Sequence, residues 1–206
     1  MRRSLSLGVA VGLYGASFGA AAAAAGFSVA QACATSLLVF TGASQFALAS
    51  VLGAGGSVAA GVASSVLLGS RNGLYAVILK ESVPAPRWRR LVAAQVTIDE
   101  STAVASTSPP RLEPVGFWWT GLTVYVVWNL STLAGAASAS AIDPKAFGLD
   151  GAVGAAFLGL LWPRLREHGR VALLGALLAI IAVPLTPPGV PVLVAGLAVL
   201  PSLRKR

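Results

Sequence analysis

Charged residues are absent from the first third of this chain. Residues 4–70 contain no Asp, Glu, Lys, Arg or His, and the whole 206-residue chain is only 11% charged, whereas soluble domains carry about 25% charged residues. As a helix, at about 1.5 Å per residue, this run extends for roughly 100 Å, or about three crossings of a hydrocarbon core about 30 Å thick. The lack of charge therefore excludes an ordinary soluble domain and indicates a protein of the lipid bilayer.

Cysteine and histidine are nearly absent as well. Cys33 and His168 are each the only residue of their kind, so the chain can form no internal disulfide and no Cys/His metal cluster. The sequence also shows no nucleophile–base pair of the kind that an embedded enzyme needs. We therefore expect no catalytic residues, no metal and no cofactor.

The chain instead has long apolar runs rich in Ala, Leu, Gly and Val. Continuous runs predict helices, because a membrane barrel would show segments of about ten residues that alternate between apolar and polar. The expected fold is an all-α polytopic membrane protein, one domain over residues 1–206, with some segments broken or re-entrant. We identify eight segments, at about 5–25, 29–53, 56–80, 91–107, 115–140, 148–163, 171–184 and 190–203.

The N-terminus resembles a secretory signal, with Arg2 and Arg3 ahead of an apolar stretch and small residues. The apolar character continues far beyond that stretch, so we expect a retained first transmembrane helix. Small residues also recur at four-residue spacing, as in Gly8/Gly12, Gly15/Gly19 and Gly69/Gly73, which predicts close helix packing.

The net charge of +8 comes from short basic clusters between apolar runs, which is typical of cytoplasmic loops rather than of nucleic-acid binding. The clusters are Arg2/Arg3, Arg87/Arg89/Arg90, Arg164/Arg166/Arg170 and Arg204/Lys205/Arg206. If all eight segments cross, only the cluster in the 80–90 loop violates the positive-inside rule. If two of the first four segments re-enter, all four clusters can be cytoplasmic. Both schemes, with six to eight crossings, place both termini in the cytoplasm.

Polar residues interrupt the apolar segments in three places. At residues 41–46, Thr-Gly-Ala-Ser-Gln-Phe predicts a non-helical or kinked stretch over 42–46 that faces a cavity, or alternatively a continuous helix bonded to a neighbour. At 69–75, Arg71 is a functional candidate that needs a partner, or else its side chain reaches an interface. At 97–102, Asp99 and Glu100 can pair with Arg71 or relay protons, unless this segment is solvated.

Asp99 and Glu100 are adjacent, so in a helix their side chains point about 100° apart. We therefore expect only one of them, Asp99 by preference, to face a cavity directly.

The run Leu38-Val39-Phe40-Thr41-Gly42-Ala43-Ser44-Gln45-Phe46-Ala47 resembles the signature of the AzlC-type branched-chain amino acid exporters. Further features fit the same family: Tyr14, Ser17, Phe18 and Gly19 in the first segment, Pro86 to Arg89 before the fourth, the Asp99–Glu100 pair, and Asp150. The sequence departs from the family pattern at Gly69, where Asn is usual, at Asn72, where His is usual, and at Thr102, where Phe is usual.

The resemblance implies efflux of leucine, isoleucine, valine or similar apolar amino acids across the cytoplasmic membrane, driven by the proton gradient or the membrane potential. It also implies a small AzlD-type membrane subunit as a partner. The expected substrate-binding residues are Gly42, Ala43, Ser44, Gln45, Phe46, Arg71, Asn72 and Tyr75, with Asp99 and Glu100 for proton coupling. The alternatives are an accessory subunit that does not transport, or a transporter of another small solute.

Overall fold

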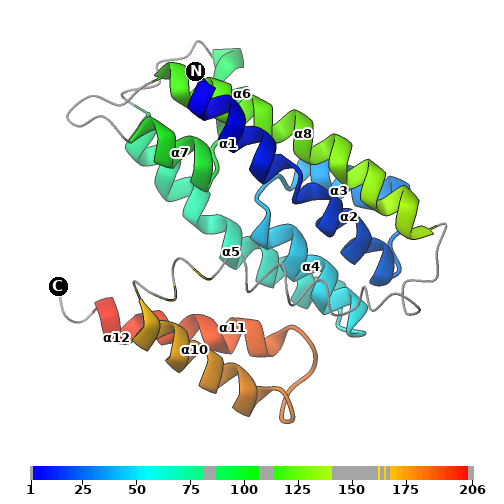
Figure 1. Cartoon of the computed structure of the whole chain (residues 1–206). Helices are drawn as coiled ribbons and strands as arrows, with labels where there is room; N and C mark the ends of the chain where they lie inside the picture. The colour runs from blue at the N-terminus through cyan, green and yellow to red at the C-terminus, as the bar shows by residue number, and fades with distance from the viewer. Residues whose placement is uncertain are drawn as a thin grey trace.

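The computed structural model describes residues 2–80, 87–106, 114–140, 162, 165 and 168–203, and over these ranges the chain forms helices and no strand (Figure 1). The predicted all-α membrane fold is confirmed. The expected segment at 148–163, Asp150 and the C-terminal basic cluster lie outside the described residues, except for Trp162.

Three stretches of the described chain are long and apolar enough to cross a membrane: Ser4–Ala24, Val58–Leu79 and Pro114–Ala139. The first is a broken helix made of α1 (Arg2–Gly12) and α2 (Gly15–Ala24). The other two are the long helices α5 (Val58–Leu79) and α8 (Pro114–Ser140). These three spans form the frame that holds the shorter helices.

Glycines let α1 and α2 approach α8 closely. A Cβ added at Gly15 would lie 2.2 Å from the backbone oxygen of Trp128, and one at Gly19 would lie 2.2 Å from that of Thr132. Gly8 and Gly12 of α1 face the side chains of Thr123 and Val127 in α8. The prediction of close packing is therefore confirmed for these two pairs. At Gly73 no described atom lies within 4 Å of an added Cβ, so for that position close packing stays a prediction.

The helices α3 (Val29–Leu38) and α4 (Ala43–Gly53) form a hairpin, here called the α3–α4 hairpin, which enters and leaves at the same end of the bundle. A Cβ at Gly53, where α4 ends, would lie 2.9 Å from the Cβ of Ala25, just before α3 begins. Each arm has only 10 or 11 residues, about half of the length that a crossing needs.

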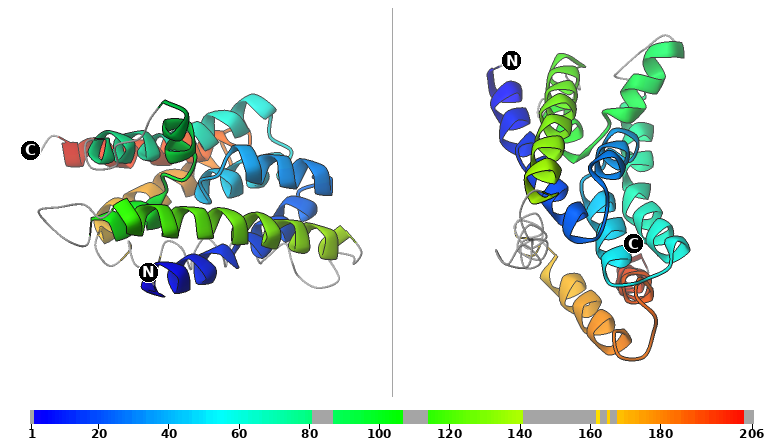
Figure 2. Two further views of the ribbon diagram at one scale, coloured as in Figure 1. Left: turned by 90° about the horizontal axis from the view of Figure 1, so that it is seen from above. Right: turned by 90° about the vertical axis from the view of Figure 1, so that its right-hand side faces the viewer.

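The helices α6 (Arg87–Gln95) and α7 (Asp99–Ala105) form a second, shorter hairpin, the α6–α7 hairpin, at the opposite end. Ala105, at the end of α7, packs with Leu79 at the end of α5 and with Phe117 near the start of α8. The N-terminus of α1 lies at this end too, as two views show (Figures 1 and 2). This arrangement favours the scheme in which the second and fourth segments re-enter and the first two basic clusters share one side.

A C-terminal helical hairpin with two arms packs beside this frame (Figure 2). It consists of α10 (Gly169–Ala182) and, after a proline-rich turn, of α11 (Val190–Gly196), the short 3-10 helix η1 (Leu197–Val199) and α12 (Leu200–Leu203). The Ser64 hydroxyl of α5 donates to the backbone oxygen of Gly189 in the turn, at 3.3 Å. The turn is thereby fixed to the start of α5, away from the tips of the two hairpins.

Candidate functional site

The tip of the α3–α4 hairpin is an uncoiled stretch over residues 39–42, and Ala43 begins α4. Gly42 has φ +56, a left-handed conformation that suits glycine. Its N–H donates to the side-chain oxygen of Gln45 at 3.2 Å, and the N–H of Ser44 donates to the Thr41 hydroxyl at 3.3 Å. The predicted break exists, but its predicted position at 42–46 was wrong. The polar side chains of the motif cap the first turn of α4 instead of interrupting it.

Ser44, Gln45 and Phe46 are buried in helix packing and are not among the cavity-lining residues. The Phe46 ring packs edge-on against that of Phe18 in α2, with centroids 5.6 Å apart. Ser44 faces Gly69 of α5, where an added Cβ would lie 3.1 Å from its hydroxyl oxygen. These three residues therefore support the hairpin tip by packing against neighbouring helices, on the side away from the cavity.

Hydroxyl groups shape the tip of the α6–α7 hairpin in a similar way. The Ser101 hydroxyl donates to the backbone oxygen of Val96 at 2.7 Å and accepts from the N–H of Ile98 at 3.1 Å. Thr97 donates to the oxygen of Ala93 at 2.6 Å. Backbone groups that lose their helical partners between α6 and α7 are thus paired locally, which lets the chain uncoil at membrane depth.

The two hairpins and α8 meet at the backbone oxygen of Leu37, near the end of α3. This oxygen accepts from the side-chain amide of Gln95, in α6, at 2.7 Å and from the hydroxyl of Tyr125, in α8, at 3.3 Å. The Tyr125 ring also packs edge-on against Phe40, with centroids 4.9 Å apart. The relative position of the two tips is therefore fixed by direct bonds.

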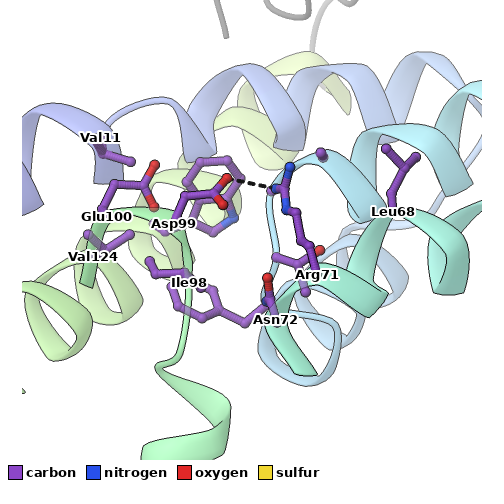
Figure 3. A pocket seen from close by; sticks show the side chains of 13 residues that line it. Val11, Leu68, Arg71, Asn72, Ile98, Asp99, Glu100 and Val124 are labelled. Carbon is purple, nitrogen blue, oxygen red and sulfur yellow. Dashed lines mark ion pairs between the residues drawn. The ribbon is translucent and has the colours of Figure 1, made fainter. Parts of the chain in front are cut away.

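A cavity of about 220 Å³ lies between the two hairpin tips, α1, α5 and α8 (Figure 3). Its wall combines apolar side chains with three charged ones. The lining residues are Val11, Phe40, Thr41, Gly42, Ala43, Leu68, Arg71, Asn72, Ile98, Asp99, Glu100, Val124 and Trp128.

An ion pair crosses this cavity wall from α5 to α7. A terminal guanidinium nitrogen of Arg71 lies 2.9 Å from Oδ2 of Asp99, and Figure 3 shows the two side chains pointing toward each other. Oδ1 of Asp99 accepts from the Tyr75 hydroxyl at 2.7 Å. Arg71 and Tyr75 are four residues apart in α5 and so lie on the same helix face. The predicted pairing of Arg71 with an acid of segment four is confirmed.

Glu100 also lines the cavity, next to Asp99 (Figure 3). The expectation that only one of these acids faces it was wrong. The reason is that Asp99 is the first residue of α7, so the cavity lies at the end of the helix and is accessible to neighbouring positions of its first turn.

Six of the predicted site residues line the cavity: Gly42, Ala43, Arg71, Asn72, Asp99 and Glu100. Tyr75 contacts the site through Asp99. Sequence reasoning missed the apolar wall, in particular Phe40, Val124 and Trp128. Phe40 directly precedes the polar motif and was therefore detectable, whereas Val124 and Trp128 lie in an apolar helix where nothing in the sequence distinguishes a cavity-facing residue from a packed one.

Comparison with protein-family models matches residues 6–142 to the AzlC protein family. The matched range contains both hairpins, every cavity-lining residue and the three candidate spans except for Ser4 and Leu5, whereas α10 and the helices after it lie outside it. No curated protein and no solved structure matches the chain.

Proposed function

This chain belongs to the AzlC family, a family of membrane proteins associated with branched-chain amino acid transport, and from that premise we propose that it exports branched-chain or similar apolar amino acids. The export runs across the cytoplasmic membrane and is driven by the proton gradient or the membrane potential. The observation that carries this proposal is the cavity between the two hairpin tips, where charges of both signs face an apolar wall.

A zwitterionic apolar amino acid fits this chemistry. Its carboxylate suits Arg71 and the N-terminal end of α4 at Ala43, where the helix dipole favours negative charge. Its ammonium group suits Asp99 and Glu100. Its side chain suits the apolar surface of Phe40, Leu68 and Val124. The cavity volume of about 220 Å³ is smaller than the roughly 300–1,000 Å³ of pockets for drug-sized ligands, which favours a small solute.

The ion pair provides a way to couple substrate binding to a change of shape. Arg71 and Asp99 join the long helix α5 to the re-entrant α6–α7 hairpin. A bound zwitterion competes for both partners, because it carries both charges itself. Binding would therefore loosen one contact between the hairpin and α5, as alternating access requires.

Unpaired polar atoms support the same interpretation. The Nε of Arg71, the Oδ1 of Asn72 and the Nε1 of Trp128 are buried and have no hydrogen-bond partner among the described residues. An unpaired buried polar group costs about 1–3 kcal/mol. A polar ligand, or a rearrangement that accompanies its binding, would lower that cost.

The proposal includes a partner, a small AzlD-type membrane subunit, and a topology with both termini in the cytoplasm. The test is efflux of leucine and the other apolar amino acids from cells preloaded with dipeptides that contain them, with the chain expressed alone, with an AzlD-type protein, or not at all. Efflux above the background of cells without the chain supports the proposal, and the first two strains show whether the partner is needed. Background efflux of every apolar amino acid in both strains that express the chain would reject it in favour of an accessory role or another solute.

A further inference from the structure

The helix α6 carries a basic and aromatic surface that the transport site does not use. Its sequence is Arg-Trp-Arg-Arg-Leu-Val-Ala-Ala-Gln, with three arginines and no acid, and none of its residues is buried. Trp88 is 65% exposed and Leu91 is 77% exposed. The Arg89 guanidinium lies 5.1 Å from the centroid of the Trp88 ring. Cations beside exposed aromatic and aliphatic side chains are typical of helices in the headgroup region of a membrane.

The position of α6 in the fold agrees with that composition. Ala93 packs on the cluster of Leu79 and Phe117, which belong to the last turn of α5 and the first turn of α8. Both helices are long and apolar enough to cross a membrane, so this cluster marks the boundary where two spans leave the hydrocarbon. Figure 1 shows α6 at the same end of the bundle as the N-terminus.

We propose that α6 binds the headgroups of anionic phospholipids in the leaflet at this end of the bundle. Arg87 and Arg89 pair with lipid phosphates, while Trp88 and Leu91 insert among the upper acyl chains. Because Gln95 bonds to Leu37 and the chain runs from it directly to Asp99, this lipid contact also anchors the hairpin that carries Asp99. The inference does not depend on which solute the protein transports.

Quenching of Trp88 fluorescence by brominated lipids tests the proposal. The full chain is reconstituted in mixed vesicles in which either phosphatidylglycerol or phosphatidylcholine carries the bromine, and the Trp88→Phe variant is subtracted to isolate the Trp88 signal. We expect a preference for the anionic lipid that decreases with salt. Each arginine near the surface contributes about fivefold, so Arg87→Gln with Arg89→Gln reduces the preference about 25-fold. The matched control Arg170→Gln, an exposed arginine at the start of α10, leaves it unchanged.

Two results overturn the proposal. Equal quenching of Trp88 by the two lipids would show that α6 does not select anionic headgroups and would leave its surface to a protein partner. Displacement of the anionic lipid by millimolar inorganic phosphate, but not by sodium chloride at the same ionic strength, would assign the arginines to a free anion. Since the substituted arginines are exposed, the variants should keep the wild-type unfolding temperature, which confirms that a lost preference reflects lost binding.

Discussion

At the residue scale, the site depends on Asp99, because this carboxylate receives both the Arg71 guanidinium and the Tyr75 hydroxyl. A neutral side chain at position 99 would weaken both contacts and free Arg71 for the carboxylate of a substrate. We therefore predict that Asp99→Asn abolishes the pH dependence of leucine efflux. Glu100→Gln, at the next position of the same cavity wall, is the matched control and should keep it. If both variants retain the parental pH profile, neither acid carries the coupling proton.

Tyr75 is a positioning residue for Asp99 rather than a direct contact of the cavity. A hydrogen bond to a charged group contributes about 1.5–3 kcal/mol. Tyr75→Phe should therefore reduce efflux at least about tenfold and shift its pH profile, while leaving protein levels unchanged. Tyr14→Phe, at a tyrosine 42% exposed, should have no effect. An unchanged pH profile in Tyr75→Phe would contradict the positioning role.

The ion pair could be predicted from the sequence, whereas the roles of the neighbouring polar residues could not. Arg71 and the acids at 99–100 stand in apolar segments, and an unpaired charge at membrane depth is too costly to persist, so pairing was one of the expected solutions, beside contact with an interface or with water. Ser44 and Ser101 are equally polar in the sequence. A hydroxyl can serve a ligand or pair with nearby backbone, and only the structure shows that Ser101 holds the uncoiled backbone at Val96 and Ile98.

At the element scale, the contact of the broken first helix with α8 relies on glycine. An added methyl group at Gly15 would meet the backbone of Trp128, which no change of side-chain rotamer can relieve. We predict that Gly15→Ala destabilises the protein by about 1–3 kcal/mol. At roughly 2–4 °C per kcal/mol for a chain of this size, the unfolding temperature in detergent should fall by about 5 °C.

Gly73→Ala is the matched control for Gly15→Ala, because it adds the same methyl group in helix α5 where no described atom lies within 4 Å. It should leave the unfolding temperature unchanged or raise it slightly, since alanine favours a helix by up to about 1 kcal/mol over glycine. Equal effects of the two substitutions would contradict the account of the α2–α8 contact.

The helical segments could be located from apolar runs, but the sequence could not show whether each segment crosses the bundle or turns back as a hairpin. An apolar run of 25 residues, such as 29–53, fits a crossing as well as a hairpin with two short arms. Two structural features identify the hairpin: the non-helical residues 39–42 and the contact between Gly53 and Ala25. This contact joins residues far apart in the sequence, and no local sequence pattern predicts it. The same holds for the fourth segment, where Gly121 of α8 packs on Val96.

At the scale of the whole molecule, the two hairpins enter from opposite ends and their tips meet at the cavity. This arrangement predicts which loops share a side of the membrane. In a Cys33→Ala background, single cysteines at the exposed positions Ala24→Cys and Ala54→Cys should react with a membrane-impermeant maleimide from outside the cell. Arg89→Cys should react only after the membrane is opened. Labelling of Ala24→Cys and Ala54→Cys from different sides would show that α3 and α4 together cross the membrane.

The central claim is that an apolar amino acid leaves the cell through the cavity lined by Arg71 and Asp99. Leucine efflux by the Arg71→Ala variant tests it most directly, because this substitution removes the guanidinium that faces both the cavity and Asp99. The account predicts that efflux falls to the level of cells without the protein, although the variant inserts into the membrane in normal amounts, and that Arg71→Lys, which keeps the charge, retains part of the activity. Wild-type efflux by Arg71→Ala would contradict the account.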